Sequence, residues 1–284
     1  MATSASVLER EFQSATPART TPAARLDIFF VLGIAIALGA VLTALRVTGL
    51  NLGYFLHPIG ALVVIGGTLG VTLITTPRHA LLHSARRIAS LLTTPGLDRG
   101  SLIEEITQSA RQARRGGMLA VESRLANIAN ADLRHAFELA VDVSNHAELR
   151  LLLETELHIA ERQGEADAKT LEVAGGFAPT LGIIGTVIGL IDVLRHFAGV
   201  SAGGSGTGYG IGAAFVSTIY GLALANLLLL PLAHRIRARV AENFETGELI
   251  LEGVLAIASN AHPSLVRMRL ESFLRRPAVP HDHP

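Results

Sequence analysis

The chain has 284 residues, of which 49% are hydrophobic and only 17% are charged, and its mean hydropathy is +0.42. That balance is too apolar for an average soluble domain and predicts a membrane protein. The formal net charge is zero, which gives no indication of nucleic-acid binding, and the lack of cysteine excludes disulfides, thiol chemistry and thiolate metal sites.

Four apolar runs are long enough, or nearly so, to cross the ~30 Å hydrocarbon core of a bilayer. In chain order they are Ile28–Leu45, Pro58–Thr76, Phe177–Leu194 and Tyr209–Ala233. The polar leader before the first run is long, and the run exceeds the apolar core of a typical signal peptide. We therefore expect a membrane helix here rather than a cleaved signal.

The spacing of the runs predicts two membrane hairpins, because a short loop joins the first run to the second and another joins the third to the fourth. A long polar segment separates the two pairs. We expect five segments: a polar leader (1–25), a first transmembrane hairpin (26–76), a central polar segment (77–176), a second transmembrane hairpin (177–233) and a polar tail (234–284).

Basic residues predict the orientation of these segments. All but two of the 24 Lys and Arg residues fall in the leader, the central segment and the tail, and the exceptions are Arg46 and Arg195. By the positive-inside rule, the three polar segments and both termini are cytoplasmic.

The central segment and the tail show apolar residues at helical spacing, and no strand alternation indicates a sheet. Ser101 and Glu104 have the spacing of a capping box at a helix start. The predicted fold class is all-α: four transmembrane helices in two hairpins, with a helical cytoplasmic domain whose last helix continues into the third run. The tail adds a further helix pair, broken at Pro263.

Small residues recur at helical spacing on one face of the third run and on one face of the fourth. They are Gly182, Gly185, Thr186 and Gly189, then Ala214, Thr218, Gly221 and Ala225. Because lipid supplies no hydrophobic force between helices, small residues allow close packing of backbones. Two interpretations stay open: tight packing inside this chain, or thin faces around a partner helix or an ion path.

Thr186 and Thr218 carry the hydroxyls on those faces. Such a hydroxyl usually bonds to a carbonyl of its own helix, and the alternative is that it helps to remove water from a small cation. Pro179 and Pro231 lie near the cytoplasmic ends of the third and fourth runs. Each marks either a kink or helix boundary, or a hinge between membrane and cytoplasmic events.

No acidic residue lies near the middle of any run. Asp192 lies toward the outer end of the third run, three residues before Arg195, where pairing or solvation is expected. A proton or cation pathway normally needs an ionisable group inside the membrane. A path lined by this chain would therefore take its titrating carboxylate from another chain.

Arg114, Arg115 and Glu122 come together in the stretch ARRGGMLAVE of the central segment. If one helix ran through this stretch, Arg115 and Glu122 would face the same way. The group forms either a solvated charged face or a contact surface for a charged protein partner.

Nothing in the sequence favours an enzyme. It contains no Walker loop, no dinucleotide-binding fingerprint and no organised nucleophile, and its 11 histidines lack the spacing of metal ligands. A solute transporter would need polar binding groups at mid-membrane and a pseudosymmetric repeat, and neither is visible. We expect no catalysis, no metal site and no cofactor.

Several separate stretches, in this order and topology, resemble the MotA/PomA flagellar stator proteins of the MotA/TolQ/ExbB proton channel group. They are VVIGGTLGVTLITTP, ARRGGMLAVE, FAPTLGIIGTVIGLI, AAFVSTIYGLALANLLLLPLAHRI and EGVLAI. The resemblance extends from about Asp27 to Leu274. ExbB- and TolQ-like members have three membrane helices, so an energiser of outer-membrane transport is the alternative that the four-helix topology disfavours.

The resemblance implies a homopentamer in the bacterial inner membrane, surrounding two helices of a MotB- or PomB-like B subunit. That B helix carries the essential aspartate. Ion flow (Na⁺ or H⁺) would be converted into torque on the rotor protein FliG, with no cofactor and no nucleic acid involved.

The resemblance also implies roles for single residues. Arg114 and Glu122 match positions that engage FliG, and Arg115 matches a supporting basic position. Pro179 and Pro231 match prolines tied to conformational coupling. Residues expected to face the ion path or the partner helix are Thr186, Thr218, Tyr220, Gly182 and Gly189. Thr186 is similar to the residue of sodium-driven members, which favours Na⁺ over H⁺, and Asp27 matches an acid found in some members.

Overall fold

The computed structural model describes residues 25–26, 28–49, 52–91, 93–94, 98–199 and 207–275. These residues are almost entirely helical, which confirms the predicted all-α fold class. Asp27, most of the leader and the Gly/Ser loop between the third and fourth runs lie outside the described residues.

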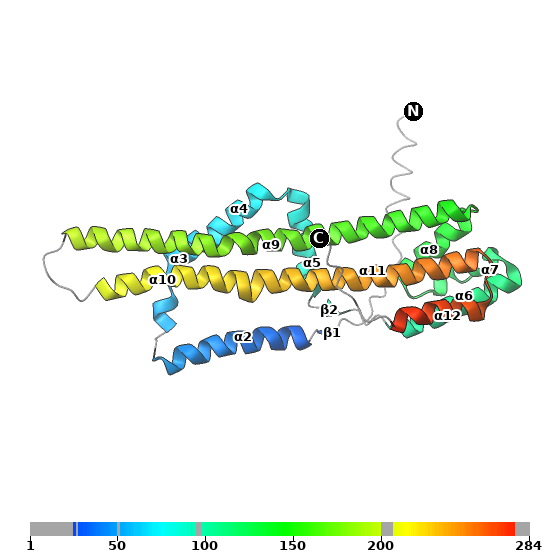
Figure 1. The fold of residues 1–284 in the computed structure, drawn as a ribbon, viewed down its shortest axis with the longest axis horizontal. Coiled ribbons are helices and arrows are strands. Elements are labelled where there is room, and N and C mark those ends of the chain that lie inside the picture. The colour runs from blue at the N-terminus through cyan, green and yellow to red at the C-terminus, as the bar shows by residue number, and fades with distance from the viewer. Residues whose placement is uncertain are drawn as a thin grey trace, which may run out of the picture.

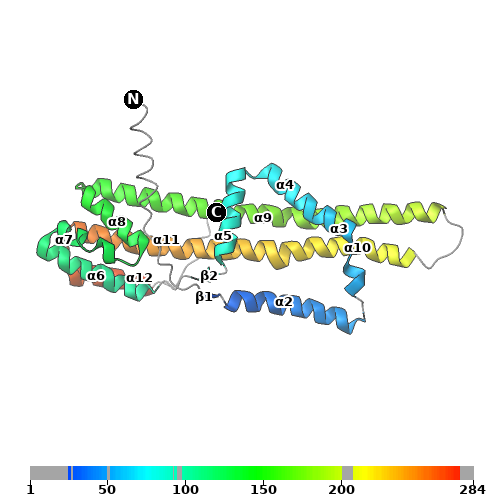
Figure 2. The same cartoon turned by 180° about the vertical axis from the view of Figure 1, so that it is seen from behind.

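Two long antiparallel helices form the frame of the molecule (Figures 1 and 2). Helix α9 (His146–Gly199) is unbroken over 54 residues. Its partner is continuous through α10 (Thr207–Ala223), the π-helical turn η4 (Leu224–Leu229) and α11 (Leu230–Ala258). At 1.5 Å per residue, α9 is about 80 Å long. It therefore combines the third apolar run with the last helix of the central segment, as the sequence predicted.

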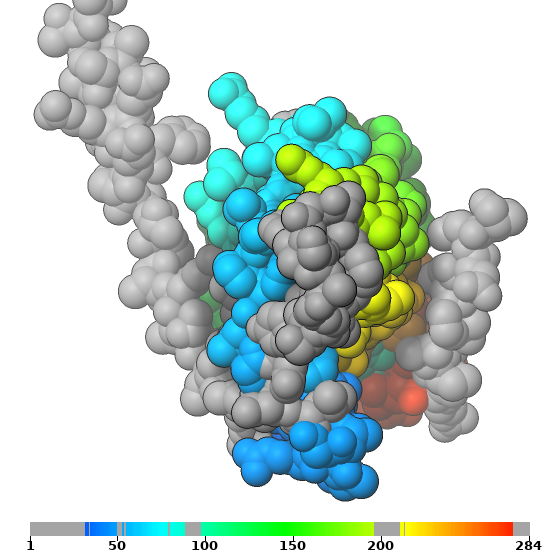
Figure 3. All heavy atoms as spheres, turned by 90° about the vertical axis from the view of Figure 1, so that its left-hand side faces the viewer, coloured from blue at the N-terminus to red at the C-terminus, as the bar shows by residue number. Residues whose placement is uncertain are grey.

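The first hairpin lies alongside one half of this frame. Helix α2 (Ile28–Val47) is followed by η1 (Leu52–Phe55), α3 (Pro58–Ala61), the π-helical turn η2 (Leu62–Gly66) and α4 (Gly67–Thr75). Figure 3, which looks along the long axis, shows α2 at the edge of the molecule. The span α3–α4 packs against α9.

The four predicted runs are all helical. Among the described residues, three helices are long and apolar enough to cross a membrane: Pro58–Thr75, the helix containing the third run and the helix containing the fourth. Ala35–Val47 of α2 is a shorter apolar stretch. Side chains such as Leu62, Ile74 and Ile188 are exposed on these helices, as expected for a protein whose outer surface meets lipid or further chains.

Helix α5 (Arg78–Leu91) follows α4 after a break at Thr76 and Pro77, and it crosses the frame. A two-residue antiparallel pairing joins β1 (Arg25–Leu26) to β2 (Thr93–Thr94), with Arg25 opposite Thr94. The expectation of no sheet was therefore wrong at this one point. A pairing this short has no hydrophobic alternation, so the sequence carried no signal for it.

The end of the frame farthest from the apolar runs carries a helical domain. It contains α6 (Arg99–Gly116), α7 (Met118–Glu122), η3 (Leu125–Asn127), α8 (Ala131–Asp142) and α12 (Pro263–Arg275), packed on the start of α9 and the end of α11. Fully buried side chains fill its centre: Ile106, Leu133, Phe137, Leu149, Leu249, Leu255 and Leu270. Each contributes about 1.5–3 kcal/mol of hydrophobic stabilisation.

The start of α6 differs from the prediction. Asp98, not Ser101, is the N-cap, and its carboxylate accepts a hydrogen bond from the backbone N–H of Gly100. Ser101 lies inside the first turn and donates to the carbonyl of Asp98 at 2.8 Å. The capping-box interpretation of Ser101 and Glu104 was wrong because Asp is an equally strong N-cap and Asp98 already caps the helix three residues before Ser101.

Candidate functional site

The apolar halves of α9 and α10 approach at backbone distance. A Cβ added to Gly182 would lie 2.9 Å from the carbonyl oxygen of Ser217 and 3.1 Å from the Cα of Thr218. A Cβ added to Gly221 would lie 2.5 Å from the carbonyl oxygen of Ala178. Both glycines are therefore required by a close approach of two backbones, the device by which membrane helices pack without a hydrophobic force.

The same contact continues toward the outer end of the helices. A Cβ on Gly189 would meet Ala214 at 2.7 Å, and a Cβ on Gly185 would meet the Cβ of Ser217 at 2.8 Å. The structure thus places Gly182 and Gly189 against α10 of the same chain. Their expected role beside a partner helix stays a prediction.

Two threonine hydroxyls meet inside this contact. The Oγ1 atoms of Thr186 and Thr218 are 2.5 Å apart. The Thr186 oxygen also lies 3.1 Å from the carbonyl oxygen of Gly182 and 3.1 Å from that of Ala214. Thr186 therefore makes the ordinary bond to its own helix and also bridges to α10. Four oxygens converge here, and Thr186 is only 8% exposed.

Tyr220 lies elsewhere. Its hydroxyl donates a hydrogen bond to the carbonyl oxygen of Phe55 and accepts one from the N–H of His57 at 3.2 Å. His57 in turn caps α3, because its Nδ1 accepts from the N–H of Gly60 at 3.0 Å. The structure does not bring Tyr220 to the hydroxyl pair. It shows Tyr220 holding α10 to the end of η1 and to the N-cap of α3, a contact that the sequence did not indicate.

The two prolines lie on the two facing helices. Pro179 lies inside the unbroken α9, and Pro231 lies in the first turn of α11, directly after the π-helical turn η4. A Cβ on Gly175 would lie 2.9 Å from Leu230, so α9 packs, one turn before Pro179, against the residue that precedes Pro231. Both positions lack a backbone donor, so each weakens the helix ladder locally.

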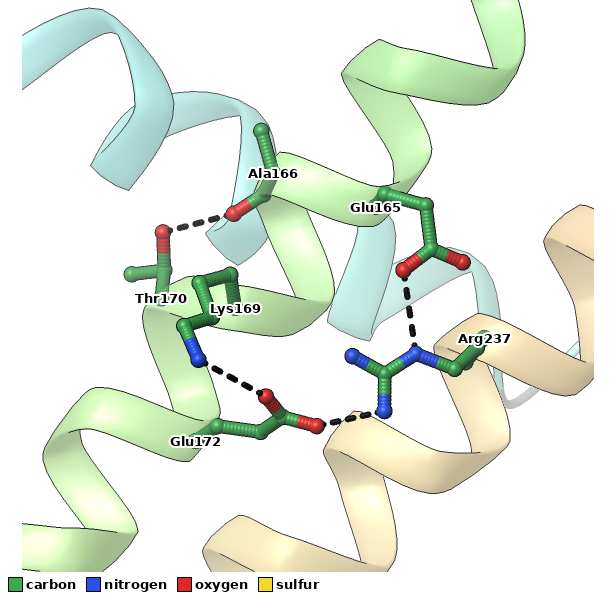
Figure 4. A network of polar contacts seen from close by, with 6 residues as sticks. All are labelled: Glu165, Ala166, Lys169, Thr170, Glu172 and Arg237. Carbon is green, nitrogen blue, oxygen red and sulfur yellow. Dashed lines mark hydrogen bonds and ion pairs between the residues drawn. The ribbon is translucent and has the colours of Figure 1, made fainter. Parts of the chain in front are cut away.

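A charged clasp joins α9 to α11 beyond the apolar runs (Figure 4). The guanidinium of Arg237 on α11 reaches Glu165 at 3.0 Å and Glu172 at 2.5 Å, both on α9, and Lys169 lies 3.6 Å from Glu172. The hydrogen bond from Arg237 lowers the pKa of the Glu172 carboxyl below its usual 4.5, and the two carboxylates raise the pKa of Arg237. Sequence reasoning missed this group, although Glu165 and Glu172 are seven residues apart on one helix face.

A second tie fastens α5 to α9. Arg87 pairs with the buried Asp167 at 2.9 Å, and Ser84 donates to the carbonyl oxygen of Asp167 at 3.2 Å. Because a buried carboxylate without a partner would be costly, Arg87 and Asp167 hold α5 at a fixed level along α9.

The charged stretch of the central segment forms a turn, not a single helix. Helix α6 ends at Gly116, and Gly117 adopts a positive φ of 72° before α7 begins. One helix therefore does not run through this stretch, so the condition under which Arg115 and Glu122 would share a helix face is not met. Only a residue without a Cβ adopts this conformation readily, so glycine at position 117 permits the break between α6 and α7.

Arg114, Arg115 and Glu122 are all exposed at this turn. Arg115 lines an open surface depression of about 330 Å³ together with Gln112, Gly116, Ala120, Ser123 and Arg124. The structure brings the three predicted residues onto one end of the molecule, around the α6–α7 turn. Among the described residues, no cluster of three or more His, Asp or Glu side chains could hold a metal ion.

Known proteins resemble this chain over most of its length. Residues 120–248 match the model of a family described as the MotA/TolQ/ExbB proton channel family. Motility protein A of Bacillus subtilis is 28% identical over 254 residues, covering 88% of this chain and 91% of that protein. Chemotaxis protein PomA of Vibrio alginolyticus is 26% identical over 249 residues, covering 88% and 96%.

Solved structures agree. The structure of C. jejuni MotAB superimposes with a TM-score of 0.81 at 25% identity and covers 91% of this chain and 98% of that one. The flagellar MotAB stator complex from Bacillus subtilis gives a TM-score of 0.78 at 28% identity, covering 87% and 95%.

Proposed function

We propose that this chain is a flagellar motor stator A subunit of the MotA/TolQ/ExbB proton channel family, and that it works in a ring of five copies around a MotB- or PomB-like partner. The relatives named motility protein A and the superimposable MotAB complexes support this arrangement. Ion flow through the assembly would supply about 2.3 kcal/mol per charge per 100 mV.

The hydroxyl pair between α9 and α10 is the observation that carries the proposal. Thr186 and Thr218 present oxygens at the centre of a contact otherwise built from glycine and alanine. The only carboxylate in the four apolar runs is Asp192, exposed toward the outer end of α9. The titrating carboxylate of an ion path would then come from the partner helix.

Sodium is the favoured ion. Na⁺ is a hard cation that prefers oxygen ligands, like the other hard cations of proteins, and the Thr186 site gathers two hydroxyls and the carbonyls of Gly182 and Ala214. A proton needs no such cluster. Proton coupling remains the alternative, and the sodium dependence of swimming decides between them.

Torque would be transmitted to the rotor by the α6–α7 turn, at the far end of the cytoplasmic domain. Arg114, Arg115 and Glu122 are exposed charges of both signs, which suits a contact with a rotor protein such as FliG. Pro179 and Pro231 lie between that domain and the hydroxyl pair on α9 and α11, so they are placed to couple the two. In the cell, the apolar halves would sit in the inner membrane, with both termini cytoplasmic.

Native mass spectrometry of this chain, co-expressed with the product of its neighbouring gene, tests the assembly. We expect five copies of the chain with two copies of a partner that has one membrane helix, an aspartate in that helix and a peptidoglycan-binding domain. A ring around a TonB- or TolR-like partner would move the function to outer-membrane energisation. A monomer or dimer without a partner would contradict both.

A further inference from the structure

Helix α5 lies where the cytoplasmic surface of a membrane would run. It begins at Arg78, immediately after the span α3–α4 ends at Thr75 and the chain bends at Thr76 and Pro77. Figures 1 and 2 show α5 crossing the long axis of the frame, whereas α9 and α11 run along it. A short helix that leaves a span at this angle follows the plane of the bilayer.

The attachment of α5 fixes its depth. Asp167, which holds Arg87 and Ser84, precedes the first residue of the third run, Phe177, by ten positions on the same helix. At 1.5 Å per residue, that is about 15 Å beyond the apolar run. The span α3–α4, however, reaches Thr75, three positions before α5 begins, so the hydrocarbon edge beside α5 is nearer than the start of the third run, and α5 adjoins a headgroup layer about 5–8 Å thick.

The face of α5 opposite this attachment is basic and partly apolar. Arg78, Leu82 and Arg86 are spaced i, i+4, i+8, and all three are exposed, Leu82 to 61%. Helix α5 contains no acidic residue. Within the described parts of the chain, neither Arg78 nor Arg86 makes an ion pair. Arg87, on the inner face, is neutralised by Asp167.

We propose that this outer face of α5, formed by Arg78, Leu82 and Arg86, binds the headgroups of anionic phospholipids in the cytoplasmic leaflet. A guanidinium donates two parallel hydrogen bonds to a phosphate, and a leucine one turn from each arginine reaches the acyl boundary, as in interfacial helices. The inference goes beyond the proposed function and rests only on the membrane placement of the apolar runs. Through Asp167, bound lipid would hold α9 at a fixed depth.

Lipid titration followed by native mass spectrometry tests the site on the complete assembly. The complex, in a neutral detergent, is titrated with phosphatidylglycerol and separately with phosphatidylcholine. We expect preferential retention of phosphatidylglycerol. The double variant R78Q/R86Q should bind it roughly thirtyfold more weakly, from two lost surface charges. R78K/R86K should bind phosphatidylglycerol with an affinity between those of the parent and R78Q/R86Q, because lysine keeps the charge but loses the paired hydrogen bonds.

The control variant R111Q/R150Q removes the same charge from exposed positions of α6 and α9 and should bind phosphatidylglycerol like the parent. Equal binding of the two lipids, or unchanged affinity in R78Q/R86Q, would overturn the proposal. So would loss of subunits in R78Q/R86Q, since the face would then cover a neighbouring copy. If that variant does not fold, R86Q alone should lose about fivefold in affinity, and no loss would again overturn the proposal.

The same spectra report the wild-type stoichiometry independently. A complex that keeps phosphatidylglycerol without assembling as five chains around two would refute the proposed function and leave the lipid site standing.

Discussion

The same two helices are held together by different chemistry at their two ends. In the apolar half, α9 and α10 meet through Gly182 and Gly221 at backbone distance, with one hydroxyl pair between them. In the polar half, α9 and α11 meet through an apolar cluster that includes Ala168 and Ile236, flanked by the Arg237 clasp.

The difference follows the solvent expected around each half. In lipid, apolar side chains gain no hydrophobic free energy by packing on each other. Small residues stabilise the contact instead, because they let the two helix backbones approach closely. In water, burial of apolar surface drives association, and charged groups around it set the register of the two helices. A helix that passes from water into lipid therefore changes the residues it uses for packing. In α9 the change, from large apolar and charged side chains to small residues, falls between Glu172 and Ala178.

Gly221→Ala should have the largest effect. Its Cβ would meet the carbonyl oxygen of Ala178 at 2.5 Å and the Cα of Gly182 at 3.1 Å, and backbone atoms cannot move aside. We expect the free energy of unfolding to fall by about 3 kcal/mol, which should appear as a large fall in the melting temperature of the purified complex. Gly176→Ala is the control, because no atom lies within 4 Å of its added Cβ. If the two variants melt alike, the close-approach account of this half is wrong.

Arg237→Gln should have the next largest effect. It removes the cation shared by Glu165 and Glu172 and leaves only Lys169, which lies 3.6 Å from Glu172. Because Arg237 is partly exposed, we expect only about 1 kcal/mol of destabilisation at low salt, and less in 1 M NaCl, where charges are screened. The effect of Gly221→Ala should not depend on salt. An Arg237→Gln effect that is equally independent of salt would remove the distinction between the two halves.

Thr186→Ala should change stability by only about 0.6 kcal/mol, the typical value of a hydrogen bond between membrane helices. Its larger consequence is functional: sodium-dependent swimming should weaken or disappear, because the oxygen cluster loses its central member. Thr180→Ala removes a hydroxyl that bonds only to Phe177 of its own helix, so it serves as control. Swimming speed that is unchanged at every sodium concentration in Thr186→Ala would refute the sodium assignment.

Acidification should produce the smallest effect, and only in the polar half. The hydrogen bond from Arg237 lowers the pKa of Glu172 in the folded protein below 4.5. The stabilisation it provides is therefore present above about pH 4.5 and is lost as pH falls toward the lowered value. The melting temperature of the wild type should exceed that of Glu172→Gln at pH 7, and the gap should shrink near pH 4. A constant gap would show that the clasp is not ionic.

Sequence periodicity was sufficient to predict features that lie within a single helix. The four apolar runs, the continuity of α9 and the small-residue faces were all visible because each is a repeat within one segment. The sequence did not predict that those two faces contact each other. Packing within the chain and packing around a partner helix both require the same small residues.

Contacts that depend on the register of two distant segments were not predictable. Arg237 on α11 pairs with Glu165 and Glu172 on α9, and Tyr220 on α10 bonds to the carbonyl of Phe55 at the end of η1. Neither pairing leaves a periodic signal in either segment. The turn at Gly117 was missed for a local reason: glycine is tolerated inside helices at a cost of about 1 kcal/mol, so a Gly-Gly pair alone does not specify a break.

The most direct test of the stator account is the rotation of single motors. The gene is deleted in its own host, and the chain is re-expressed gradually with its B partner while a bead on a flagellar stub reports speed. The account predicts stepwise increases in speed, one for each stator that joins the motor, and none when the membrane aspartate of the partner is replaced by asparagine. A motor that turns equally well without the chain, or an assembled complex that never adds a speed step, would contradict it.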